Sequence, residues 1–187
     1  MKLEELKKEI ELAFAGIKLE NGIGYYEAAA IDDYLNPTSK GYKALKAKDE
    51  REDWRKMLIF IRDKDRNFLD SFRYHFMDTK GLRFFLPILL TRREFECLSY
   101  MFLNLISGQH DSSIIEMLSL LTPAQEKCIL DAYKIEINFE GEIAYYSDLG
   151  FSRENAIKKI QETDDYAICE FLKRYFDTKR ANNLLKS

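Results

Sequence analysis

Apolar side chains recur every three or four residues along most of this chain. One such run comprises Leu3, Leu6, Ile10, Phe14 and Ile17, and another comprises Phe95, Leu98, Met101, Phe102, Leu105 and Ile106. Spacing of this kind places the apolar side chains on one face of an α-helix. Residues that break helices are scarce, with 8 glycines and 3 prolines in 187 residues. We therefore predict an all-α fold, a multi-helix bundle that forms a single domain over residues 1–187.

Interruptions of the apolar spacing predict the individual helices. We expect helices over residues 3–18, 25–35, 95–108 and about 123–135. The polar stretch Thr38–Asp53 is predicted to be an exposed helix or a mobile connection. In the buried segment Leu82–Leu90, which follows a break at Gly81, Pro87 either opens a helix in its first turn or kinks a longer one. Alternation of Ile135, Ile137 and Phe139 leaves a short strand or an irregular segment as an alternative near residues 135–147.

Four short motifs predict where later helices begin. Ser113-Ile-Ile-Glu116 and Thr122-Pro-Ala-Gln125 have the spacing of capping boxes, in which the hydroxyl and the Glu or Gln side chain each bond to the backbone of the other residue. Ser152 is expected to cap the next helix, and Asp164 or Asp165 the last one.

Composition narrows the functional classes. The N-terminus is too charged for a signal peptide, and no stretch reaches the ~20 apolar residues of a membrane span, so we expect a soluble cytoplasmic protein with no membrane association. Cys97, Cys128 and Cys169 are far apart and form no C-x-x-C pair, which is typical of reduced, buried cysteines. With only 2 histidines as well, we expect neither a metal site nor a cofactor.

No catalytic motif stands out, so the chain is predicted not to be an enzyme. Phosphate-binding loops, nucleophile elbows and H-E-x-x-H sites are all missing from the sequence. His75 lies in the most aromatic part of the chain, where a packed or capping role is expected; His110 stands in a turn-like stretch and is expected at the surface. Glu162, Asp164 and Asp165 are expected to mark a helix entry. An enzyme using His75 with a nearby acid remains an alternative.

Charge is unevenly distributed and favours protein binding over nucleic-acid binding. Between Asp111 and Glu170 there are 13 acidic and 5 basic residues, a net charge of −8. That bias is opposite to a nucleic-acid binder. These acidic residues form either a solvated acidic face or a surface that attracts and orients a basic protein partner. Adjacent helical residues point about 100° apart, so the doublets Tyr25-Tyr26 and Tyr145-Tyr146 should each have one partly exposed ring, as is common in interface hot spots. The predicted partner-binding residues are Glu142, Tyr145, Tyr146, Asp148, Asp164 and Asp165.

Three motifs carry a resemblance to a bacterial helical family of unknown activity. Trp54-Arg55, then Gly81-Leu-Arg-Phe-Phe-Leu-Pro87, then Leu121-Thr-Pro-Ala-Gln125 resemble that family's W-R, G-x-R-[FY]-[FY]-L-P and L-T-x-x-Q core. Phe68-Leu69 belongs to the same stretch. The chain departs from the family in the polar segment Asp70–Asp78 and in an additional acidic C-terminal region. In size and character it is similar to immunity proteins of polymorphic toxin systems, including those of contact-dependent growth inhibition.

The leading hypothesis is therefore a non-enzymatic immunity protein that binds and neutralises a cognate toxin domain. Nuclease toxins are basic because they hold nucleic acid, and an acidic face would cover such a site. A regulatory or scaffold domain that binds an endogenous protein is the alternative.

Overall fold

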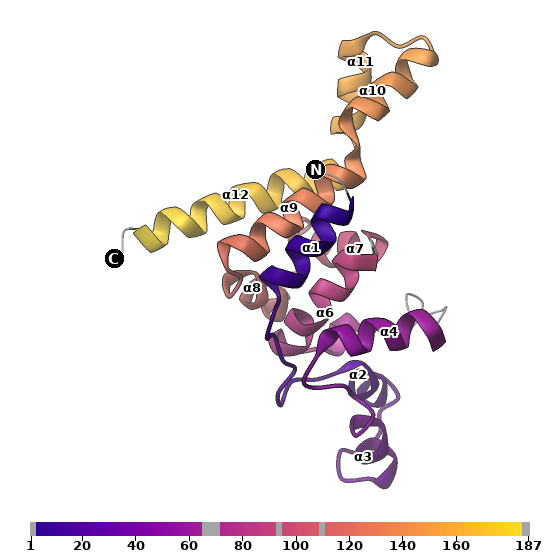
Figure 1. Ribbon diagram of the computed structural model, residues 1–187, viewed down its shortest axis with the longest axis vertical. Coiled ribbons are helices and arrows are strands. Elements are labelled where there is room, and N and C mark those ends of the chain that lie inside the picture. The colour runs from indigo at the N-terminus through magenta and orange to yellow at the C-terminus, as the bar shows by residue number, and fades with distance from the viewer. Residues whose placement is uncertain (1–2, 65–71, 93–94, 109–110, 185–187) are drawn as a thin grey trace.

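The chain forms a bundle of helices, seen in the computed structural model, which describes residues 3–64, 72–92, 95–108 and 111–184. In chain order the elements are α1 (Leu3–Ala13), α2 (Tyr25–Asp32), α3 (Lys40–Lys46), α4 (Trp54–Lys64), the short 3₁₀ helix η1 (Tyr74–Phe76), α6 (Thr79–Arg92), α7 (Phe95–Ile106), α8 (Ser112–Ser119), α9 (Pro123–Ile137), α10 (Phe139–Asp148), α11 (Arg153–Gln161) and α12 (Asp164–Leu184) (Figure 1). The described residues contain no strand, which confirms the all-α prediction.

Helix α6 forms the centre of the main core. It packs against α1, α4, α7, α8 and α9, and its buried residues are Leu82, Phe84, Phe85, Leu86, Pro87, Ile88, Leu89 and Leu90. The sequence suggested a helix break at Gly81, but Gly81 lies in the first turn of α6. Pro87 lies inside α6 rather than at the start of a helix, so the alternative of a longer helix around this proline is the correct one.

Two buried side chains fix the C-terminal end of α1. Trp54 at the start of α4 donates from Nε1 to the carbonyl of Phe14 at 3.1 Å. Gln125 in the first turn of α9 donates from Nε2 to the carbonyl of Ala13 at 2.9 Å. The last carbonyls of a helix have no partner within the helix, and the Gln125 bond satisfies that of Ala13. The Trp54 bond adds to the one that the carbonyl of Phe14, just after α1, accepts from the N–H of Ile17 at 3.3 Å.

A close backbone contact holds the segment after α1 against the start of α6. The carboxylate of Asp78 accepts from the backbone N–H of Gly81 at 2.8 Å and from that of Ile23 at 3.0 Å. A Cβ added to Gly81 would lie 2.1 Å from the carbonyl oxygen of Ile23. Position 81 therefore admits no side chain without a backbone shift.

The C-terminal helix α12 completes the main core. It packs on α9 and α7 through Ile168, Leu172 and Phe176, each 0% exposed. Lys179 anchors its second half, because its ammonium group donates to the carbonyl of Leu118 in the last turn of α8 at 3.1 Å and to that of Leu121, just after α8, at 2.6 Å. Beyond this anchor the helix extends away from the body (Figure 1).

Helix boundaries correct several predictions. Residues 135–147 contain no strand: α9 continues to Ile137 and α10 begins at Phe139, with Asn138 between them in the left-handed conformation (φ 42°). The Thr122-Gln125 capping box is confirmed, as is Ser152 as the cap of α11. Helix α8 is capped by Asp111 instead of Ser113, and Thr163 instead of Asp164 or Asp165 accepts from the N–H of Tyr166 at the start of α12.

Four residues named in the sequence analysis lie outside the described part of the chain, namely Phe68, Leu69, Asp70 and His110. Within the described helices, none combines the length and apolar content that a membrane crossing requires.

Candidate functional site

Helices α10 and α11 form a hairpin, here called the arm, with a small core of its own. Ile143, Ala156 and Ile160 are buried in that core. Half-buried apolar residues pack around them, namely Ile137, Phe139, Tyr146, Ile157 and Tyr166. The arm projects from one end of the body, and α2 and α3 lie at the opposite end (Figure 1). Its outer surface is therefore not needed to fill the main core.

Local sequence explains how the arm leaves the body. Asn138 ends α9 in the left-handed conformation that Asn tolerates better than most residues, and its carbonyl accepts the first backbone bond of α10, from Glu142, at 3.0 Å. Gly150, with a φ of +87°, forms the turn at the far end. The Ser152 hydroxyl then accepts from the N–H of Asn155 and starts α11.

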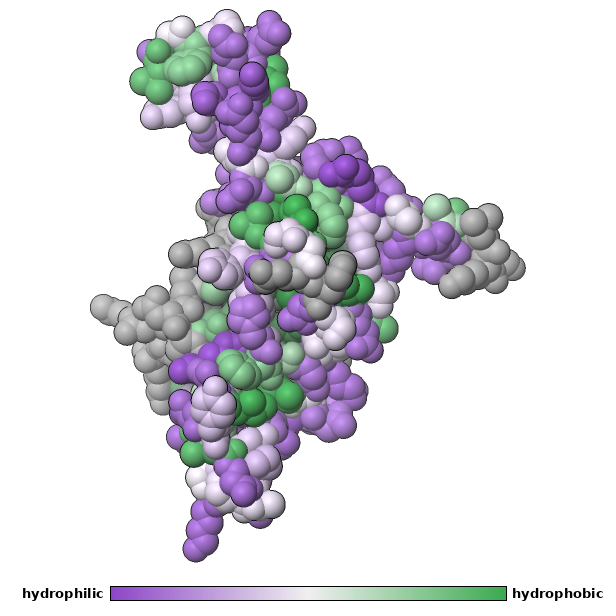
Figure 2. All heavy atoms as spheres, turned by 180° about the vertical axis from the view of Figure 1, so that it is seen from behind, coloured by the Kyte–Doolittle hydropathy of each residue, from purple (hydrophilic) through white to green (hydrophobic). Residues whose placement is uncertain are grey.

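The free end of the arm exposes large apolar side chains. Tyr145 is 58% exposed, Leu149 57% and Phe151 39%. Tyr146 packs inward instead, with its ring centroid 5.7 Å from that of Phe151. A hydrophobic patch is visible at the free end of the arm in Figure 2. Exposed aromatic and aliphatic side chains in one small area are characteristic of protein-binding surfaces.

Carboxylates without an ion partner lie on the arm, with Asp148 and Glu154 near this patch and Glu142 in the first turn of α10. In the part of the chain that the structure describes, Glu142, Asp148 and Glu154 form no ion pair, and Asp148 and Glu154 are exposed. Two further acids of the arm are paired, Glu140 with Arg153 and Glu162 with Lys159, both at 3.2 Å. Both ion pairs are largely exposed to solvent, so the attraction between their charges contributes little free energy.

Four of the six predicted partner-binding residues lie together on α10: Glu142, Tyr145, Tyr146 and Asp148. Asp164 and Asp165 lie in the first turn of α12, outside the arm. Asp164 is exposed, whereas Asp165 accepts a hydrogen bond from the hydroxyl of Ser99 on α7 at 2.8 Å. The sequence-based prediction did not include Leu149 and Phe151. The signal for them was available, because they are apolar residues on either side of Gly150, which is a turn residue.

Two acidic residues between Asp111 and Glu170 are paired with lysine or arginine inside the body. Glu126 is 1% exposed and accepts from Lys179 at 2.7 Å and from Arg180 at 2.9 Å. Burial raises the pKa of Asp131, but hydrogen bonds from Lys127 and Lys134 outweigh it and leave that pKa below its ordinary value. The acidic surface is thus narrower than the composition suggested, and the acidic residues of the arm that form no ion pair with a described residue are Glu142, Asp148 and Glu154.

A buried polar cluster that the sequence did not reveal joins α2 to α3. Glu27 is 3% exposed and accepts from the hydroxyl of Tyr42 at 2.7 Å, from Lys46 at 2.6 Å and from Arg51 at 3.3 Å. Burial raises the pKa of Glu27, and the bonds from Lys46 and Tyr42 lower it further than burial raises it. This cluster gives α2 and α3 a fixed relative orientation.

His75 lies at the surface, whereas Cys128 and Cys169 are buried. The ring of His75 is exposed and lies against Tyr74, with centroids 3.8 Å apart. No carboxylate of the described residues hydrogen-bonds to it. Burial raises the pKa of Cys128 to about 11 and raises that of Cys169, so neither thiol is activated as a nucleophile. Among the described residues, no group of three or more His, Cys, Asp and Glu side chains is placed to hold a metal ion.

Comparison with known proteins identifies the family. A family model described as "Family of unknown function (DUF6714)" matches residues 2–135, and the chain belongs to that family. The matched residues run from α1 to the last turns of α9, so the arm and α12 lie beyond them. No curated protein and no solved structure gives a significant match.

Proposed function

We propose that this chain is a non-enzymatic protein-binding domain that docks on a basic partner through the arm. The observation that supports this is the combination at the free end of the arm of exposed Tyr145, Leu149 and Phe151 with unpaired carboxylates. An apolar centre surrounded by charged residues is the usual anatomy of a specific interface.

The partner proposed here is a cognate bacterial toxin domain, which the chain neutralises as an immunity protein. A nuclease toxin has a basic surface because it binds nucleic acid, and the carboxylates of Glu142, Asp148 and Glu154 are complementary to such a surface. The position of the arm beyond the residues matched by the family also supports a partner-specific role, since the shared part supplies most of the packed body.

The partner should be identified by a tagged pull-down from the native cell, followed by mass spectrometry. We expect one stoichiometric toxin C-terminal domain. Recovery of a housekeeping protein alone would favour the regulatory or scaffold alternative, and recovery of no partner would count against both.

The docking site is then tested with variants of the arm. Glu142→Lys combined with Asp148→Lys should slow association with the captured partner by about tenfold and flatten its dependence on salt, because electrostatic steering is lost. Tyr145→Ala should act mainly on dissociation, by about tenfold or more, as truncation of an interface anchor does. Glu11→Lys, an exposed charge reversal on α1, is the matched control. Unchanged rates and an unchanged salt slope in the arm variants would place the interface elsewhere.

A further inference from the structure

A cavity of ≈ 670 Å³ lies at the end of the molecule opposite the arm. It is formed by α2, by α4 and by the segment that follows α3, and its lining residues are Tyr26, Ala47, Lys48, Asp49, Glu50, Lys56, Met57 and Phe60. Its volume falls within the range of small-molecule sites, about 300–1,000 Å³.

Both acidic side chains of the cavity are already used by the backbone. Asp49 accepts from the N–H groups of Tyr26 at 2.8 Å and Glu27 at 3.1 Å, so it caps α2, and its side chain is 1% exposed. Glu50 accepts from the N–H groups of Glu52 at 2.9 Å and Asp53 at 3.2 Å. The carboxylates therefore have donors from the protein and do not require a ligand.

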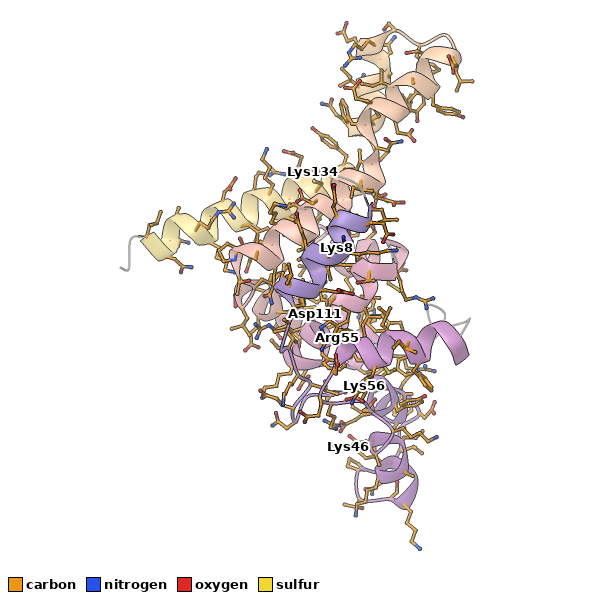
Figure 3. The ribbon with its side chains drawn as sticks, viewed as in Figure 1. Lys8, Lys46, Arg55, Lys56, Asp111 and Lys134 are labelled. Carbon is orange, nitrogen blue, oxygen red and sulfur yellow. The ribbon has the colours of Figure 1, made fainter. Side chains whose placement is uncertain are left out.

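The ammonium groups of both lysines have hydrogen-bond donors that are not used within the cavity. Lys48 lies over the ring of Tyr26, with Nζ 5.5 Å from the centroid, and forms no ion pair within the described part of the chain. The Nζ atom of Lys56 is 4.0 Å from the nearest Glu50 oxygen, which is beyond hydrogen-bond distance. Figure 3 shows Lys56 on α4, close to α2. The free hydrogen-bonding capacity of the cavity consists of ammonium donors, which suit an anion.

The remaining walls are aromatic and apolar. Tyr26 and Phe60 pack edge to face with centroids 6.1 Å apart, and Met57, which is 3% exposed, lies beside them on α4. Such surfaces favour a flat apolar ligand body.

We propose that this cavity binds a small aromatic anion, with the ring of the ligand against Tyr26, Met57 and Phe60 and its charged group on Lys48 and Lys56. The site is separate from the arm and does not depend on the proposed toxin partner.

The test is calorimetric titration of the full chain with 1-naphthoate, compared with its neutral isostere 1-naphthamide. The carboxylate should bind at least about tenfold more tightly than the amide, because charge-assisted hydrogen bonds are the stronger ones. Lys48→Ala and Lys56→Ala should each weaken binding of 1-naphthoate by about five- to tenfold. Lys43→Ala, an exposed lysine on α3 outside the lining, is the matched control and should leave binding unchanged.

A variant that fills the cavity with a larger side chain tests where the ligand binds without changing any charge. Ala47 is exposed at the edge of the cavity, so Ala47→Phe should weaken binding more than about tenfold while the thermal midpoint stays unchanged. Equal affinity for the two naphthalenes, binding that neither lysine variant alters, binding that survives the filling variant, or no binding at millimolar ligand would each overturn the proposal.

Discussion

Gln125 on α9 donates to the carbonyl of Ala13, the last residue of α1, and Trp54 on α4 donates to that of Phe14, the next residue. At position 81 the carbonyl of Ile23 lies too close for any side chain, so only glycine fits there. Trp54, Gly81 and Gln125 each belong to one of the three motifs that carry the family resemblance. Each therefore has a packing role that accounts for its residue type. The motifs identify the fold of the family and give no information about its activity.

Not all residue-scale features could be read from the sequence. The Thr122 capping box is local, so four neighbouring residues predict it. The bonds that Glu27 forms with Tyr42, Lys46 and Arg51 span 15 to 24 residues, and nothing in the spacing of these residues indicates that they meet. The same holds for Asp49, which caps α2 from a segment that follows α3.

The Glu27 cluster predicts a pH-dependent contribution to stability. Glu27→Gln should lower the free energy of unfolding at about pH 7 by about 1–3 kcal/mol, because Lys46 and Arg51 lose their buried partner. The pKa of Glu27 is depressed in the folded protein. Its stabilisation is therefore present above the ordinary carboxyl pKa of about 4.3 and is lost as the pH falls through the lower folded value.

Urea denaturation of Glu27→Gln and of the unaltered protein, at neutral pH and at a series of acidic pH values, measures this effect. The difference between the two proteins should shrink toward acid pH. Glu4→Gln, which removes an exposed pair with Lys7, is the control and should change little. A difference that is constant with pH would contradict the assignment.

At the scale of elements, the sequence located most helices but misplaced several ends. Apolar spacing found α1, α2, α7 and α9, yet α1 was predicted five residues too long because Phe14 and Ile17 continue the apolar pattern after the helix ends at Ala13. Near residue 138 the alternation of apolar residues spans a break between two helices, and it imitates the pattern of a strand. In both places the tertiary packing of a turn produces the apolar pattern.

Helix α8 offers a test of which residue caps it. Asp111 accepts from the N–H groups of Ser113 at 2.9 Å and Ile114 at 3.4 Å. Asp111→Ala should lower the free energy of unfolding by about 1 kcal/mol, whereas Ser113→Ala should change it by less than about 0.5 kcal/mol. Urea unfolding followed by circular dichroism gives both values, and a larger loss for Ser113→Ala would restore the capping box predicted from the sequence.

At the scale of the whole molecule, the arm is an insertion between two helices that pack on each other. Helices α9 and α12 are in direct contact, and the arm occupies the chain between them. The sequence predicted an acidic, tyrosine-containing binding surface in this region. It could not separate the carboxylates paired inside the body from those that are unpaired on the arm, since that depends on Lys179 and Arg180 from α12.

Replacing residues 139–163 with a short Gly-Ser linker should therefore leave the body folded. We expect a cooperative thermal transition with a midpoint within about 5 °C of the full chain, because the core contacts of α12 and the Lys179 anchor are kept. Circular dichroism during heating measures the midpoint, and capture of the partner by the shortened chain should be lost. A broad transition would show that Ile137 and Tyr166, which pack against the arm, require it for order.

The chain contains one tryptophan, and its position determines which part of the protein intrinsic tryptophan fluorescence monitors. Trp54 is 2% exposed, its indole N–H is bonded to the end of α1, and it belongs to the main core. Its emission consequently follows the polarity around the junction of α1 and α4. The arm contains no tryptophan, so opening of its small core would leave the wavelength of tryptophan emission unchanged while the helical ellipticity falls. The two spectroscopic signals thus separate the arm from the body without any label.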